Sequence, residues 1–186
     1  MAVFTPKTEL AKRLWEIRMR SIASGENEPL LDWEGVQKEV ADRRGELGWF
    51  IVKRRIFLDS GVLIAAFRGS DEIAQKALEV IDDPDIEFAS SVFVKLETLP
   101  MPRYNKRKSE AEFYDEFFKN ITAWAEPGEE LAQSALDEAS KNGLGAMDAL
   151  HVMSAVKCKA DEFITAEQTT KPFSRVTKIP VRFISQ

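Results

Sequence analysis

The sequence predicts an α/β domain with a mainly parallel central sheet, preceded by a short helical segment. From residue 55 to the end, short apolar stretches alternate with helical ones, an order typical of parallel sheets with helical crossovers. Carboxylates recur at the ends of the apolar stretches, where parallel sheets usually bind ligands. The chain has 186 residues, 44% of them hydrophobic, which is enough to bury such a core.

One carboxylate, Asp59, stands where the first predicted strand gives way to a helix, in the stretch RIFLDSGVLIAAF. The strand is expected over 56–59 and the helix from Gly61. An Asp in this place is commonly a helix N-cap. It also lies at the sheet edge where a ligand would bind, so for Asp59 alone both roles stay open.

The remaining elements follow from apolar spacing and from helix-breaking residues. Strands are expected at 86–89, 121–125, 163–165 and 181–184, and helices at 71–81, 91–99, 110–118, 129–140 and 146–156. Pro100 and Pro102 are expected to end the helix that starts at Ser91, because proline interrupts helical hydrogen bonding. The aromatic residues of 110–118 share one helical face and are expected in the core.

The first residues read as two amphipathic helices, the first starting at Thr5 and Pro6 and the second at Asp32. Helices this short gain their stability from packing. We therefore expect the segment to lie on the main domain or to act as a dimerisation arm.

The composition limits the partners and the cellular compartment that the sequence fits. The net charge is −5, and the acidic excess falls after residue 54, which argues against a uniformly basic nucleic-acid surface. Cys158 is the only cysteine, which excludes an internal disulfide and suits a reducing compartment. No apolar run approaches the roughly 20 residues of a membrane span, so we expect a soluble, cytoplasmic protein without membrane contact.

Like Asp59, three further carboxylates stand near the ends of predicted strands and helices. Glu97 interrupts the apolar helix after the second strand, Asp148 opens another apolar helix, and Glu167 follows the strand at 163–165. Individually they read as an ion-pair partner, a first-turn helix acid and a solvated loop residue. Four acids gathered along one sheet edge, however, suit a hard divalent cation, Mg²⁺ or Mn²⁺.

The stretches IFLDSGVLIAAF, SVFVKLE, MDALHVMSA and EFITAE, taken in order, resemble the motifs of the PIN-domain nucleases, especially the VapC-like toxins of bacterial toxin–antitoxin pairs. The resemblance covers nearly all of 55–186. It implies a PIN fold and an endoribonuclease that depends on Mg²⁺ or Mn²⁺. It also implies that the metal-binding and catalytic residues are Asp59, Glu97, Asp148 and Glu167.

The chain departs from that pattern in two places. Glu167 stands where the family usually has Asp. Asp161 is the alternative candidate for the fourth acid, but it precedes the strand predicted at 163–165. Gly61 stands where Asn or Ser is common. His151, three residues after Asp148, is interpreted as structural and not as a general base.

A basic stretch is the candidate RNA contact, because Lys and Arg neutralise phosphates. Its members, with Tyr104 between them, are Arg103, Lys106, Arg107 and Lys108. A solvated charged turn explains the same residues equally well.

The N-terminal segment resembles the toxin-binding tail of the cognate antitoxins, which suggests a division into an antitoxin-like segment (1–47), a connector (48–54) and a PIN domain (55–186). Such tails lay helices in a toxin groove, and Arg43 or Arg44 could reach the acidic centre as an inhibitory contact. We expect this segment to bind the PIN domain in cis or in a swapped dimer, and we expect a homodimer.

The leading hypothesis is therefore a metal-dependent ribonuclease restrained by its own N-terminal segment. One alternative is a catalytically silent PIN fold that acts as an RNA-binding or assembly module. Another is an ordinary α/β protein with dimerising N-terminal helices.

Overall fold

The structure is a computed structural model that describes residues 6–25, 27 and 53–186. In this part of the chain, five strands form one sheet in the order β3-β2-β1-β4-β5, and every neighbouring pair is parallel. The strands are β1 (Arg54–Leu58), β2 (Ile86–Ser91), β3 (Ile121–Ala125), β4 (Glu162–Thr165) and β5 (Val181–Phe183). The predicted α/β class is thereby confirmed, and the sheet is wholly parallel.

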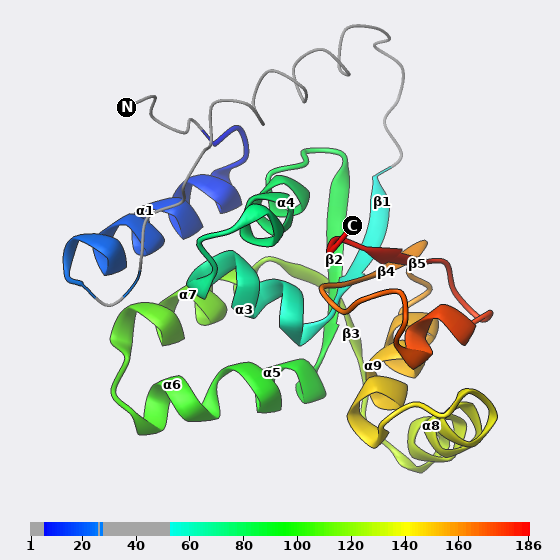
Figure 1. The fold of residues 1–186 in the computed structure, drawn as a ribbon. Helices are drawn as coiled ribbons and strands as arrows, with labels where there is room; N and C mark the ends of the chain where they lie inside the picture. Colours follow the sequence, from blue (N-terminus) through cyan, green and yellow to red (C-terminus); the bar gives the residue numbers. More distant parts are fainter. Residues whose placement is uncertain (1–5, 26, 28–52) are drawn as a thin grey trace, which may run out of the picture.

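Helices cover both faces of the sheet, as parallel strands require. One side carries α3 (Ser60–Arg68), α4 (Glu72–Ile81) and α7 (Lys108–Lys119), and the other carries α8 (Glu129–Asn142) and α9 (Ala146–Lys157) (Figure 1). The short helices α5 (Val92–Thr98) and α6 (Pro100–Tyr104) follow β2, and the 3₁₀ turn η1 (Pro172–Arg175) precedes β5. None of the described helices is long and apolar enough to cross a membrane.

Helix α5 ends at Thr98, before Pro100 and Pro102 as predicted, but a second short helix follows at once. Pro100 is the first residue of α6, a position where its missing N–H would be unpaired in any case. Arg103 and Tyr104 consequently lie on a helix. The expected basic loop is the end of α6, a short turn in which Lys106 has a positive φ of 55°, and the start of α7.

The N-terminal helix α1 (Glu9–Ala23) begins later than the sequence suggested. Thr8, and not Thr5, is its N-cap, with its hydroxyl accepting from the Ala11 N–H. Asp82, the C-cap of α4, accepts hydrogen bonds from the backbone N–H groups of Lys7 and Thr8, at 2.8 and 2.9 Å. The start of α1 is therefore fixed to the end of α4.

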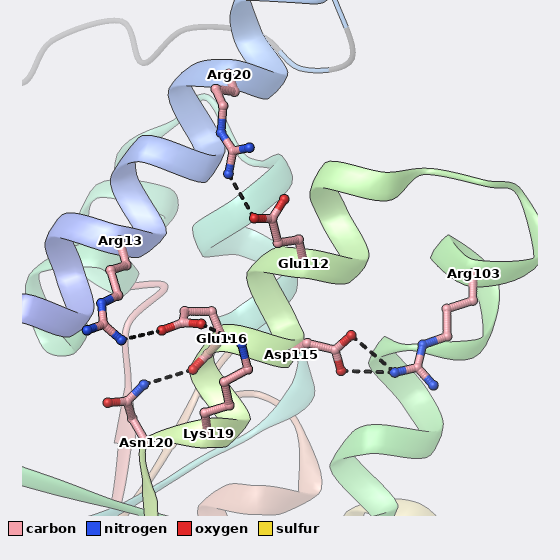
Figure 2. A network of polar contacts seen from close by, with 8 residues as sticks. All are labelled: Arg13, Arg20, Arg103, Glu112, Asp115, Glu116, Lys119 and Asn120. Carbon is pink, nitrogen blue, oxygen red and sulfur yellow. Dashed lines mark hydrogen bonds and ion pairs between the residues drawn. The ribbon is translucent and has the colours of Figure 1, made fainter.

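Helix α1 packs into the same core as the sheet. Leu14 and Ile17 are buried in the main hydrophobic cluster, and the fully buried Arg18 donates to backbone carbonyl groups at the end of α3. Figure 2 shows the outer contacts, in which Arg13 and Arg20 of α1 pair with acids of α7 at 2.9 Å each. The described part of the N-terminal segment is thus an integral layer of the fold.

The second predicted helix, which starts at Asp32, and the predicted inhibitory residues Arg43 and Arg44 lie outside the described residues.

Candidate metal centre

Asp59 is held at the carboxyl end of β1 by three neighbours. It caps α3, with Oδ1 accepting from the Ser60 N–H at 2.8 Å. The same oxygen lies 3.0 Å from Nδ1 of His151, and Oδ2 accepts from Oγ1 of Thr165 at 2.9 Å. The residue is only 7% exposed. Asp59 is therefore the helix cap that its sequence context suggested, and its carboxylate is also fixed in orientation from two other elements.

Glu97, on α5, turns its carboxylate toward Asp59. Its Oε2 accepts from Oγ of Ser60 at 2.6 Å and lies 3.4 Å from Nε2 of His151. Oxygen or nitrogen atoms of Asp59, Glu97 and His151 all lie within 4.8 Å of one another. The ring of His151 thus bridges two of the predicted acids, which come from different elements.

All four predicted acids line one cavity of about 610 Å³. Asp148 lies in the first turn of α9, whose N-terminus favours a negative charge, and Glu167 lies in the loop after β4. Parallel topology explains this convergence, because the loops and helices that follow β1, β2 and β4 all start at the same sheet edge.

The cavity concentrates negative charge. Burial raises the pKa of the Asp148 carboxyl, and the charge of Asp59 raises it further, while His151 and the Gly145 backbone oppose this in part. For His151, burial alone would lower the pKa, but the hydrogen bond to Asp59 and the charges of Asp59 and Glu97 outweigh it. The pKa of His151 therefore lies above its ordinary value. The shift of Asp148 reports repulsion between carboxylates, which a bound cation would relieve.

The two departures from the family pattern have clear structural settings. Gly61 lines the cavity, and a Cβ there would stand 3.7 Å from Oδ2 of Asp59, so its lack of a side chain leaves this wall open. Asp161, the fallback acid, accepts from the backbone N–H of Arg55 before β4 begins. It is therefore at the opposite end of the strands from Asp59.

Sequence reasoning missed two residues of this cavity's surroundings. Thr165 closes β4 and orients Asp59. Lys171 lines the cavity, with Nζ 3.9 Å from Oε2 of Glu167. The terminal position of Thr165 in an apolar strand was a usable signal, whereas the placement of Lys171 depends on the path of the loop.

The four predicted RNA-contacting residues differ in their surroundings. Arg103 pairs with Asp115 of α7 at 2.9 Å, and Arg107 lies 3.5 Å from the buried Glu110. Lys106 and Lys108 are exposed. Tyr104 is 82% exposed, and Leu96 of α5 and Met101 of α6 are also exposed.

The donor set fits a divalent cation. Carboxylate oxygens suit Mg²⁺ and Mn²⁺, and these carboxylates converge from four elements on one cavity. The residues placed to hold the ion are Asp59 and Glu97, with Asp148 and Glu167 at the cavity wall.

The molecule is thus a parallel α/β protein with an acidic cavity at the carboxyl edge of its sheet. The family model described as "PIN domain" matches residues 56–178, and the chain belongs to the PIN domain family.

Comparison with solved structures supports the same fold. A chain of VapBC2 from Rickettsia felis, in a structure bound to a DNA fragment from the VapBC2 promoter, is 16% identical. Its TM-score is 0.53, and the match covers 69% of this chain and 98% of that one. A chain of DNA-bound VapBC from Salmonella typhimurium is 14% identical with a TM-score of 0.49, covering 70% and 98%. Comparison with curated proteins gave no match.

Proposed function

We propose that the protein is a toxin-type endoribonuclease that depends on Mg²⁺ or Mn²⁺ and acts in the cytoplasm. The observation that carries the proposal is the convergence of Asp59, Glu97, Asp148 and Glu167 on one cavity. Membership of the PIN family and the fold shared with a VapBC chain support it.

Each acid has a role in the proposed chemistry. Asp59 and Glu97 hold the metal, and Asp148 and Glu167 complete the negative cavity from its wall. A bound divalent ion would supply a water of lowered pKa and offset the charge that builds on the phosphate. Hydrogen bonds from Ser60 and Thr165 keep Glu97 and Asp59 in one orientation, so the site does not need to reorganise when substrate arrives.

RNA would leave the cavity past the exposed apolar side chains of α5 and α6. Tyr104 offers an exposed ring on which a base can stack. Lys106 and Lys108 are placed to contact phosphates beyond it. Arg103 and Arg107 contribute less direct attraction, because Asp115 and Glu110 already compensate their charges.

The proposal includes restraint by the N-terminal segment, acting in cis or on a second copy in a homodimer. Helix α1 itself reaches the far end of α3, at Ala66 and Gly69, whereas Asp59 caps the near end. Nine helical residues separate the two by about 13 Å. Helix α1 therefore does not itself contact Asp59 in cis, and the candidates for an inhibitory contact remain Arg43 and Arg44.

Substitution tests this restraint better than truncation, because deleting α1 would remove Leu14 and Ile17 from the core. Cleavage of a panel of structured and single-stranded RNAs, with Mg²⁺ or Mn²⁺, should be compared between the full chain, Asp59→Asn, the double variant Arg43→Ala/Arg44→Ala, and the triple variant. We expect the double variant to cut faster than the unmodified chain, and both Asp59→Asn proteins to be inactive.

Two other outcomes would change the proposal. Equal cutting by the unmodified chain and the double variant would remove these arginines from the inhibitory role. No cutting by any version, at metal concentrations shown to bind, would favour the silent RNA-binding or assembly module.

A further inference from the structure

We propose that His151 is a nitrogen ligand of the metal site and makes the site select Mn²⁺ over Mg²⁺. This inference rests on the proposed metal-dependent function, and it gives His151 a role beyond the structural one that the sequence suggested. It follows from the direction in which the two ring nitrogens point.

The first step concerns Nδ1. This atom lies 3.0 Å from Oδ1 of Asp59, and an ionised carboxylate can only accept hydrogen bonds. Nδ1 therefore carries a hydrogen and donates it. A carboxylate that receives the far N–H of an imidazole is the usual partner of a metal-binding histidine, because it fixes the ring and makes the other nitrogen a better ligand.

The second step concerns Nε2. His151 is 1% exposed, and Nε2 has no hydrogen-bond partner among the described residues. It faces Oε2 of Glu97 at 3.4 Å. Two donors that bind one ion at right angles, each at roughly 2.1 Å, stand about 3 Å apart. Nε2 and Glu97 are therefore spaced as neighbouring ligands of a single ion.

Asp59 holds the ring from the side of Nδ1, opposite to Nε2. Oδ1 is engaged by the Ser60 N–H and by His151. Oδ2 accepts only from Thr165 among the described residues and keeps a second lone pair for a metal. The result is a set of two carboxylates and one imidazole in which one oxygen or nitrogen atom of each residue lies within 4.8 Å of those of the other two.

The nitrogen ligand determines which of the two metal ions the site prefers. Mg²⁺ is bound almost entirely by oxygen, whereas Mn²⁺, although it also favours oxygen, belongs to the first-row series of divalent ions that bind mixed nitrogen and oxygen sites. An oxygen-only site would treat the two ions more evenly. A buried nitrogen in the set raises the affinity for Mn²⁺ selectively.

The test compares the full chain with His151→Asn, which can still donate toward Asp59 from the position of Nδ1 but lacks Nε2. Titration with Mn²⁺ and with Mg²⁺, in the absence of RNA, measures both affinities. Pulsed electron paramagnetic resonance of the Mn²⁺ complex detects a directly bound ¹⁴N. We expect a ¹⁴N signal in the unmodified chain only, and a loss of Mn²⁺ affinity of about tenfold or more in the variant, with Mg²⁺ affinity nearly unchanged.

Ser154→Ala is the matched control, since Ser154 is fully buried on the same helix and does not belong to the cluster of Asp59, Glu97 and His151. It should leave both affinities and the ¹⁴N signal intact, and thermal melting without metal should show that all variants fold. A Mn²⁺ complex without ¹⁴N coupling, or equal loss of both ions in His151→Asn, would overturn the inference and leave the carboxylate site standing. Failure of the unmodified chain to bind either ion would overturn the inference and the proposed function together.

Discussion

Thr165 donates a hydrogen bond of 2.9 Å from Oγ1 to Oδ2 of Asp59, and so ties the end of β4 to the end of β1. Oγ1 of Thr165 also accepts a hydrogen bond from the backbone N–H of Glu167, at 3.1 Å. One buried hydroxyl therefore sets the orientation of the first acid and the start of the loop that carries the fourth.

Replacing Thr165 by Val should weaken the metal site while preserving the fold. Valine keeps the branched shape but leaves Asp59 without its donor, and loss of such an outer partner typically lowers metal affinity by roughly 10- to 100-fold. Titration with Mn²⁺ measures the change. Thr165→Ser retains the hydroxyl and should bind nearly as the unmodified chain does. Equal binding by the Val variant would show that the hydroxyl does not position Asp59.

Replacing Lys171 should change the affinity for metal and the affinity for RNA in opposite directions. Its Nζ lies 3.9 Å from Oε2 of Glu167 in the acidic cavity. Lys171→Gln removes a positive charge near the proposed metal, so metal affinity should rise, by at most about fivefold for an exposed pair. RNA affinity should fall, and the slope of log affinity against log salt should become shallower by about one. Binding assays in EDTA over a range of salt check the RNA effect, and a shift of both affinities in one direction would contradict it.

Tyr104→Ala should weaken binding of single-stranded RNA. The ring is 82% exposed, and stacking of one base on an aromatic side chain contributes about 1 to 3 kcal/mol, so a loss of at least about fivefold is expected. Fluorescence anisotropy with labelled RNA, without metal, gives the affinity. Tyr104→Phe should retain it, and Leu136→Ala, at an exposed apolar position of α8, should have no effect. Equal weakening by Tyr104→Phe would rule out stacking as the cause.

The sequence allowed the fold class and the acid positions to be predicted because both depend on local pattern. Asp59 stands at a strand end and Asp148 in the first turn of an apolar helix, and a parallel sheet brings such positions to one edge. Glu97 was found because it interrupts an otherwise apolar helix.

The contacts made by these acids could not be predicted in the same way. His151 and Asp59 are 92 positions apart, and Thr165 and Asp59 are 106 apart, so their pairing depends on tertiary packing. The helix that follows the second strand ends before Pro100, as predicted, but the short helix that begins at Pro100 was not predicted, because proline both stops helices and starts them. The burial of Arg18 likewise depends on tertiary packing, since its guanidinium donates to carbonyl groups at the end of α3.

Arg18→Leu should destabilise the protein more than any change on the outer face of α1. The guanidinium donates to the carbonyl oxygens of Ala66 and Phe67 and, at 2.5 Å, of Gly69, and burial lowers the pKa of Arg18 to about 10, so it stays charged at neutral pH. Leucine would leave buried carbonyl groups unpaired at the end of α3, at a cost of about 3 kcal/mol. Urea denaturation should show a lower midpoint with an unchanged slope.

Arg20→Leu is the control for that change, because Arg20 and its partner Glu112 are largely exposed. Such surface pairs contribute less than about 1 kcal/mol, so its midpoint should stay close to that of the unmodified chain. The difference in midpoint between the two variants measures how much the buried contacts of Arg18 contribute. Arg18 donates to carbonyl groups at the end of α3, whereas Arg20 pairs with Glu112 at the surface. Similar midpoints for both would mean that the contacts between Arg18 and the end of α3 contribute little to stability.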